Sequence, residues 1–246
     1  VHAVLLIYVL WMILSFALGL RHSPFTFTTI RQFAQTLLSI GMVFLLVDIL
    51  RDPKTLRKLI FIVLLGAGIQ ALIVLGLYIL PDLTAENILN RLGRIGYPVG
   101  GVIRYIESNP ALPERAIGTW IDPNALGGVL AISAVMIAPQ ILAQKPVLRY
   151  RWLTFIIFAL LVLGLVLSFS RASALALVIG LTIIAVVKYQ RVIPLLIIGL
   201  LLALLLPQTQ DYIGRFIDAF TGADLATQMR IGEYTDSLRL IERYPI

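Results

Sequence analysis

The chain has 246 residues, of which 59% are hydrophobic and 13% are charged, and its mean hydropathy is +0.95. Soluble domains carry about a quarter charged residues, so this composition places the chain among membrane proteins. The absence of cysteine excludes disulfides and thiolate metal sites. The formal net charge of +7 is divided among short stretches between apolar runs, a distribution that argues against nucleic-acid binding.

Apolar runs long enough to cross a hydrocarbon core of about 30 Å recur along the whole chain. They lie near residues 3–20, 33–50, 58–80, 119–143, 152–169, 172–187 and 192–207. Each must be helical in lipid, where no water satisfies an open backbone. We therefore predict an all-α polytopic membrane protein with about seven transmembrane helices in a single transmembrane domain. Because the sequence lacks an initial methionine, we expect it to be a fragment of a longer protein.

The basic residues divide the loops into two kinds. All the lysines of the chain, Lys54, Lys58, Lys145 and Lys188, fall in short connections that alternation puts on one side. The positive-inside rule makes that side cytoplasmic. The turn at 21–32, the loop at 81–118 and the tail from 208 to 246 then face outward and contain arginine without lysine. Weak surface pairing with acidic neighbours explains most of these arginines.

The outer loop at 81–118 is rich in glycine and proline, which predicts irregular structure with a short helix near 84–92. It leads into the segment GTWIDPNALG at 118–127. Asp122-Pro123 is a helix-start signal, and Asn124 enters the next span. The amide of Asn124 either caps this helix at the membrane interface or faces protein or lipid headgroups.

A small polar patch interrupts the apolar stretch 163–180. Ser168, Phe169 and Ser170 precede Arg171, which stands at the mouth of two predicted spans. A charged residue there is a functional candidate, although an arginine can also extend its side chain to the headgroups. Small residues at 172, 176 and 180 recur at helical spacing, so we expect this face to pack closely against a neighbouring helix.

The tail contains two amphipathic patterns. The residues around 211–220 predict a helix that lies in the outer interface. The residues 225–243 predict a second helix, on which Arg230 stands one turn before Tyr234. We interpret 208–246 as the start of a large periplasmic loop.

Three segments, GTWIDPNALGGVLA (118–131), SFSRASALALVIGL (168–181) and RIGEYTDSLRLIERYP (230–245), occur in this order. Together they resemble the motifs of the O-antigen ligase and O-antigen polymerase superfamily. The resemblance implies a GT-C-like glycosyltransferase of the bacterial inner membrane that needs no metal or other cofactor. Such enzymes invert the configuration at the anomeric carbon of the transferred sugar. They take a glycan from undecaprenyl pyrophosphate on the periplasmic face and pass it to lipid A–core or to another glycan.

On the matching positions, Arg171 and Arg230 would be catalytic, because they would bind the donor pyrophosphate and stabilise its charge as it leaves. Ser170, Asn124 and Tyr234 would contact substrate. Tyr234 stands where the family usually has tryptophan. The family's acceptor-activating histidine has no counterpart at His2 or His22, and we expect it beyond Ile246.

Two other readings stay open. An arginine-rich outer mouth also suits an anion transporter of the bicarbonate type, which predicts polar groups through the membrane midplane. Only Gln70 is strongly polar in mid-span, which favours the enzyme. A scaffold subunit of an envelope complex is the third reading.

Overall fold

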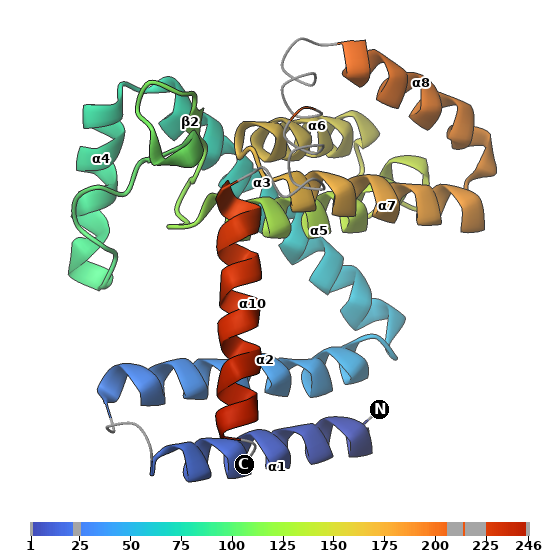
Figure 1. Cartoon of the computed structure of the whole chain (residues 1–246). Coiled ribbons are helices and arrows are strands. Elements are labelled where there is room, and N and C mark those ends of the chain that lie inside the picture. Colours follow the sequence, from blue (N-terminus) through green and yellow to red (C-terminus); the bar gives the residue numbers. More distant parts are fainter. Residues whose placement is uncertain (1, 22–25, 206–213, 215–224, 245–246) are drawn as a thin grey trace. The chain divides into compact units, whose positions relative to one another are not determined.

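The computed structural model describes residues 2–21, 26–205, 214 and 225–244, and these are mostly helical (Figure 1). The α-helices are α1 (His2–Gly19), α2 (Phe27–Ile49), α3 (Pro53–Ile79), α4 (Asp82–Asn90), α5 (Pro123–Leu142), α6 (Arg151–Leu167), α7 (Arg171–Val187), α8 (Ile193–Leu205) and α10 (Leu225–Arg243). Single 3₁₀ turns are η1 (Arg91–Ile95), η2 (Ile106–Ser108) and η3 (Gln190–Val192). Two short strands, β1 (Arg104–Tyr105) and β2 (Glu114–Arg115), form an antiparallel ribbon.

Three helical stretches are long and apolar enough to cross a membrane: Phe27–Val47, Pro53–Ile79 and Pro123–Leu142. The other four predicted spans are also helical and apolar, but shorter, at Ala3–Gly19, Arg151–Leu167, Arg171–Val187 and Gln190–Leu201. The prediction of a helical protein of the membrane type is thereby confirmed. The prediction of about seven membrane crossings stays a prediction.

Two helices begin earlier than the apolar runs predict, because polar caps set their starts. The carboxylate of Asp52 accepts hydrogen bonds from the backbone N–H groups of Lys54 and Thr55, each at 3.1 Å, and α3 begins at residue 53 rather than 58. The hydroxyl of Thr26 accepts from the N–H of Thr29 at 3.2 Å, and α2 begins at 27 rather than 33. Hydropathy marks the lipid-facing part of a helix, not its caps.

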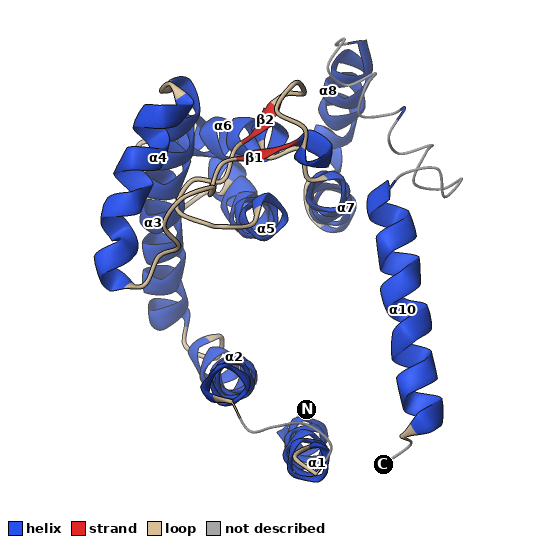
Figure 2. Cartoon of the chain, turned by 60° about the vertical axis from the view of Figure 1, so that its left-hand side comes forward, coloured by secondary structure: helices blue, strands red, loops and turns tan. Residues whose placement is uncertain are grey.

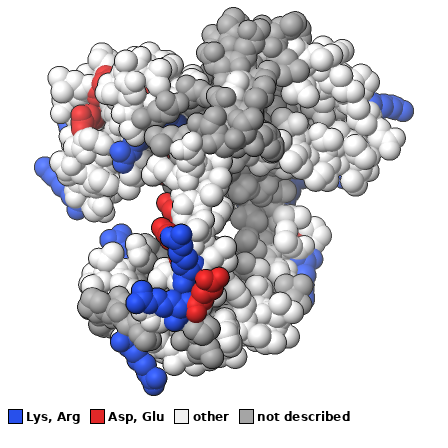
Figure 3. Space-filling view, viewed as in Figure 1, with Lys and Arg blue, Asp and Glu red and all other residues white. Residues whose placement is uncertain are grey.

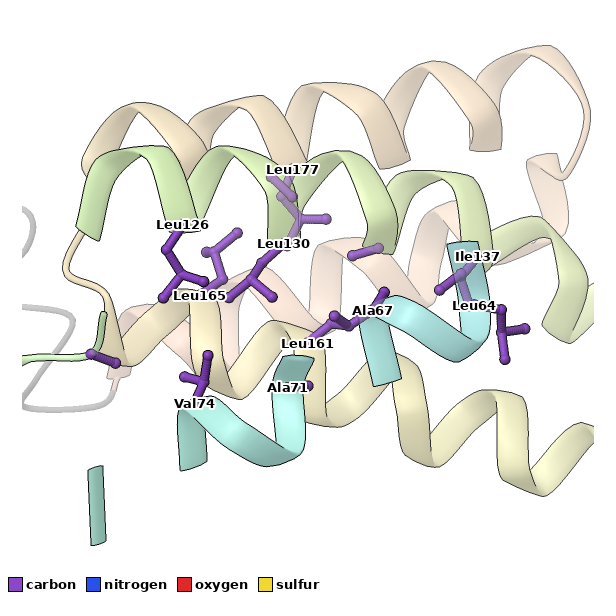
Figure 4. Close-up of a cluster of buried hydrophobic side chains, with 13 residues drawn as sticks. Leu64, Ala67, Ala71, Val74, Leu126, Leu130, Ile137, Leu161, Leu165 and Leu177 are labelled. Carbon is purple, nitrogen blue, oxygen red and sulfur yellow. The ribbon is translucent and has the colours of Figure 1, made fainter. Parts of the chain in front are cut away.

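The chain divides into two compact units, residues 59–229 and residues 1–58 with 230–246. The larger unit has its apolar core between α3, α5, α6 and α7 (Figure 4). Leu126 and Leu130 of α5, Leu161 of α6 and Val74 of α3 are completely buried there. The core therefore holds α5, which carries the first predicted motif, against α6 and against α7, whose first part carries most of the second motif.

The packed face of α7 differs from the predicted one. Ser173 and Leu177 are buried, whereas Ala172 and Ala176 are exposed. Of the three small residues, only Gly180 packs closely against a neighbouring helix, since a Cβ added there would lie 2.6 Å from Cγ2 of Val135 on α5. The spacing of small side chains predicted the wrong packed face for α7. Ser173 turns inward instead, because its hydroxyl requires a polar partner and finds it inside the protein.

The outer loop contains more regular structure than the sequence predicts (Figure 2). The predicted short helix is present as α4 and η1. Beyond it, β1 and β2 pair in a register that sets Arg104 opposite Arg115 and Tyr105 opposite Glu114. The residue after β2 continues inward, where the backbone N–H of Ala116 donates to the carbonyl of Leu167 at 2.8 Å.

In the smaller unit, Phe16 of α1 stacks on Phe33 of α2 with ring centroids 4.0 Å apart. The predicted helix at 225–243 is confirmed as α10. The interfacial helix predicted around 211–220, the end of the last predicted span and His22 lie outside the described residues.

Most of the described surface in Figure 3 carries neither acidic nor basic side chains, and the charged ones stand in small groups. Many large apolar side chains on the long helices are exposed, including Leu38 at 71% and Ile62 at 64%. Surfaces of this kind suit contact with lipid rather than water.

Candidate functional site

Arg115 joins two of the predicted motifs. Its Nε donates to the backbone carbonyl of Ser168 at 2.9 Å, and its Nη2 donates to the amide oxygen of Asn124 at 2.9 Å. Nη2 also lies 3.5 Å from the carbonyl oxygen of Phe169. The planar guanidinium of arginine has donors in a fixed fork and suits several fixed acceptors at once. The start of α5 and the turn before α7 are thus connected through a residue of the outer ribbon.

The turn between α6 and α7 has an unusual backbone. Helix α6 ends at Leu167, and Phe169 then adopts a φ of 51°, in the left-handed region that bulky residues rarely occupy. Such a conformation costs about 1–3 kcal/mol and persists where its surroundings hold it. Here the carbonyls of Ser168 and Phe169 are held by Arg115.

The serines of the second motif form a buried cluster beneath this turn. The hydroxyl of Ser168 donates to the carbonyl of Leu165 at 2.7 Å and accepts from the N–H of Ser170 at 3.3 Å. The hydroxyls of Ser170 and Ser173 are 2.8 Å apart. Each of the three serines is at most 6% exposed. Ser170, which the sequence predicted to contact substrate, therefore has its hydroxyl turned to the interior.

Gly127 of α5 lets this serine cluster approach the helix backbone. A Cβ at this position would lie 2.8 Å from Cβ of Ser170, 2.9 Å from Oγ of Ser173 and 3.0 Å from Oγ of Ser168. Real Cβ atoms almost never come within 3.0 Å of such neighbours. The glycine of the first motif and the serines of the second motif are therefore complementary in shape.

The first motif begins with a second tight glycine. Gly118 has a φ of 53°, and a Cβ there would lie 2.6 Å from Cγ2 of Val74 and 2.7 Å from Nε2 of Gln70. The hydroxyl of Thr119 donates to Oε1 of Gln70 at 3.0 Å. Nε2 of Gln70 is buried and has no hydrogen-bond partner among the described residues. The predicted helix start at Asp122 is confirmed, since its carboxylate accepts from the N–H of Asn124 at 2.9 Å.

Glu114, the neighbour of Arg115 on β2, lines a small apolar pocket with Tyr78 of α3 and with Ala85 and Leu89 of α4. Loss of hydration in this pocket, with a smaller contribution from the charge of Asp82, raises the pKa of the Glu114 carboxyl to about 7. Asp82 accepts a hydrogen bond from the Tyr105 hydroxyl, which raises the pKa of Tyr105 to about 12. The ribbon thus carries a carboxyl, that of Glu114, which changes its protonation near neutral pH.

The predicted site residues fall into two groups. Asn124, Ser170 and Arg171 belong to the larger unit and are connected through Arg115 and the turn. Arg171 is the first residue of α7 and is half-buried. Arg230 and Tyr234 belong to the other unit, one turn apart on α10, and both are exposed, Tyr234 at 67%.

Sequence reasoning missed Arg115 and Glu114. Both stand in the breaker-rich part of the outer loop, where no helical or strand periodicity predicts which side chains turn inward. The only signal is position, three residues before the Gly118-Thr119 of the first motif.

Among the described residues, no three His, Cys, Asp or Glu side chains gather in a way that could hold a metal ion. No protein-family model, curated protein or solved structure matches the chain.

Proposed function

We propose that this chain is a membrane glycosyltransferase of the O-antigen ligase type. It transfers a glycan from undecaprenyl pyrophosphate to lipid A–core, or to another glycan acceptor, on the periplasmic face of a bacterial inner membrane. The proposal includes about seven spans in a GT-C-like arrangement and chemistry that uses no metal. A polysaccharide polymerase of the same superfamily would differ only in its acceptor.

One observation supports the proposal most directly. Two segments that resemble superfamily motifs, 118–131 and 168–181, are joined by Arg115 through Asn124 and the Ser168 carbonyl. Gly127 of the first segment also contacts the serines of the second, in a fit that leaves no room for a Cβ. Residues that act in one site must lie together in the fold, and these two segments meet that requirement.

The chemistry proposed for this site is electrostatic. The acceptor hydroxyl attacks the anomeric carbon, the bond from that carbon to the pyrophosphate oxygen breaks, and the electron pair stays on the departing lipid pyrophosphate. The proton of the acceptor passes to a base. Arg171 at the start of α7 is proposed to stabilise the developing negative charge, because arginine binds phosphate oxygens with two parallel donors and stays charged. The motif resemblance gives Arg230 the same role.

The test uses membranes that contain the protein, an undecaprenyl-pyrophosphate-linked oligosaccharide and a lipid A–core acceptor. Glycan transfer and release of lipid pyrophosphate are followed in the wild type, in Arg171→Ala and in Arg230→Ala. Arg94→Ala, which changes an exposed arginine on η1, is the matched control. We expect transfer to fall by at least about 100-fold in both site variants, as for loss of one charge-stabilising group, and to persist in the control.

Full transfer by both site variants would refute the catalytic roles. If the wild type transferred no glycan to any acceptor but took up bicarbonate into vesicles, the transporter reading would replace the enzyme. Transfer to a second glycan repeat, without transfer to lipid A–core, would make the protein a polymerase.

A further inference from the structure

Arg115 lies in the one place where the outer loop, the start of α5 and the turn before α7 meet. Its contacts at 2.9 Å to Ser168 and Asn124 go to neutral oxygens, a backbone carbonyl and a side-chain amide. Bonds of this kind are charge-assisted, and they hold the acceptors in fixed positions relative to the planar guanidinium.

The turn that Arg115 holds has a conformation that its own sequence does not favour. Phe169 has a φ of 51°, and Arg171 follows two residues later as the first residue of α7. A change at Phe169 rotates the peptide groups between it and the helix. The direction in which the Arg171 side chain leaves the backbone therefore depends on the carbonyls that Arg115 holds.

We propose that Arg115 is a positioning residue that fixes the turn at 168–170 and thereby orients Arg171 toward the pyrophosphate of the donor. The orienting role rests on the proposed function, whereas the hold on the turn does not. Displacement of a reacting or stabilising group by about 1 Å can cost about 100-fold in rate, so a residue without substrate contact can control the reaction. Arg115 needs its fork for this task, because a lysine ammonium is a point charge without fixed donor directions.

The experiment compares Arg115→Lys with Arg104→Lys. Arg104 stands directly opposite Arg115 in the ribbon and is exposed, so the control makes the same chemical change in the same small element. Two quantities are measured for the protein in lipid nanodiscs. The first is hydrogen–deuterium exchange of residues 168–173, which requires no activity. The second is the kcat and KM for glycan transfer from the undecaprenyl-pyrophosphate donor.

We expect Arg115→Lys to speed exchange of residues 168–173 by about tenfold, which is the effect of losing about 1.4 kcal/mol of local stabilisation. We expect kcat to fall by about tenfold or more with a smaller change in KM, because orientation toward the leaving group acts in the transition state. Arg104→Lys should leave both quantities at wild-type values. A purely structural loss would instead lower the amount of active enzyme without changing kcat per folded molecule.

Unchanged exchange in Arg115→Lys would overturn the proposal. Faster exchange with undiminished kcat would overturn the orienting role. If the wild type transferred no glycan, the proposed function would fail by itself, and the exchange result would still decide whether Arg115 holds the turn. If Arg115→Lys failed to fold, Asn124→Ala would replace it. This variant removes one acceptor of Arg115, and its exchange at 168–173 must rise for the proposal to stand.

Discussion

The contact between Gly127 and the serine cluster gives the sharpest test of the fold, because the next residue supplies its own control. A Cβ at Gly127 would lie within 3.0 Å of Ser168, Ser170 and Ser173, whereas a Cβ at Gly128 would meet nothing within 4 Å. Both glycines lie inside α5. Alanine at either position gains about 1 kcal/mol of helix propensity. That gain cancels when the two variants are compared, so their difference isolates the steric cost.

Forcing an extra methyl group into a packed interior costs about 1–3 kcal/mol. The cluster around Gly127 falls in the upper part of this range, because the Cβ of Ser170 is fixed to the backbone of the turn and cannot swing away. We therefore expect Gly127→Ala to be less stable than Gly128→Ala by roughly 2–3 kcal/mol. For a chain of this length that difference corresponds to a Tm lower by about 4–12 °C.

The assay is thermal unfolding of the purified variants in one detergent, followed by the loss of helical circular dichroism. Gly128→Ala should unfold at or slightly above the wild-type Tm. If Gly127→Ala unfolded at the same temperature as Gly128→Ala, the close approach of α5 to the serine cluster would be refuted.

Two further predictions concern the outer loop and the start of α5. Because the folded pKa of Glu114 lies above the ordinary value of 4.5, at about 7, the neutral carboxyl stabilises the fold. This contribution is complete below about pH 4.5 and is lost as the pH rises through about 7. After a discount for the solvent-facing side of the half-buried carboxyl, it amounts to about 1–2 kcal/mol. Glu114→Gln should flatten the decline of Tm between pH 5 and 8. If the pH dependence of Tm were the same in this variant as in the wild type, the raised pKa of Glu114 would be contradicted. Asp122→Ala should lower stability by about 1 kcal/mol through loss of the α5 cap, measured as a Tm shift. Asp236→Ala, at an exposed ion pair with Arg239, should leave Tm unchanged, and equal shifts in the two variants would show that Asp122 does not act as a cap.

Hydropathy predicted the helices well because apolar runs of this length have few alternatives to a hydrogen-bonded helix in lipid. The runs near 119–143 and 172–187 correspond closely to α5 and α7. The errors lie at helix starts, where Thr26 and Asp52 act through single hydrogen bonds that an average over many residues does not detect.

The site was less predictable because its contacts join distant parts of the chain. The segments that we interpreted as motifs, with Asn124 and Arg171, were singled out from the sequence. Arg115, by contrast, contacts residues 9 and 53 positions further along, and nothing local in the loop marks it. The buried face of α7 was also missed, because the pairing of Ser173 with Ser170 depends on the turn that precedes the helix.

The long sequence separation of the Arg115 contacts has a consequence for the order in which the protein is made. When a ribosome has just added Arg115, Ser168, whose carbonyl accepts the hydrogen bond from Nε of Arg115, is added only 53 residues later. At translation rates of about 5–20 residues per second, that interval is roughly 3–11 s. During it, Arg115 has no Ser168 carbonyl to bind. The contact between the loop and the turn before α7 can form only after residue 168 has been added, so this part of the loop reaches its final structure later than its own synthesis.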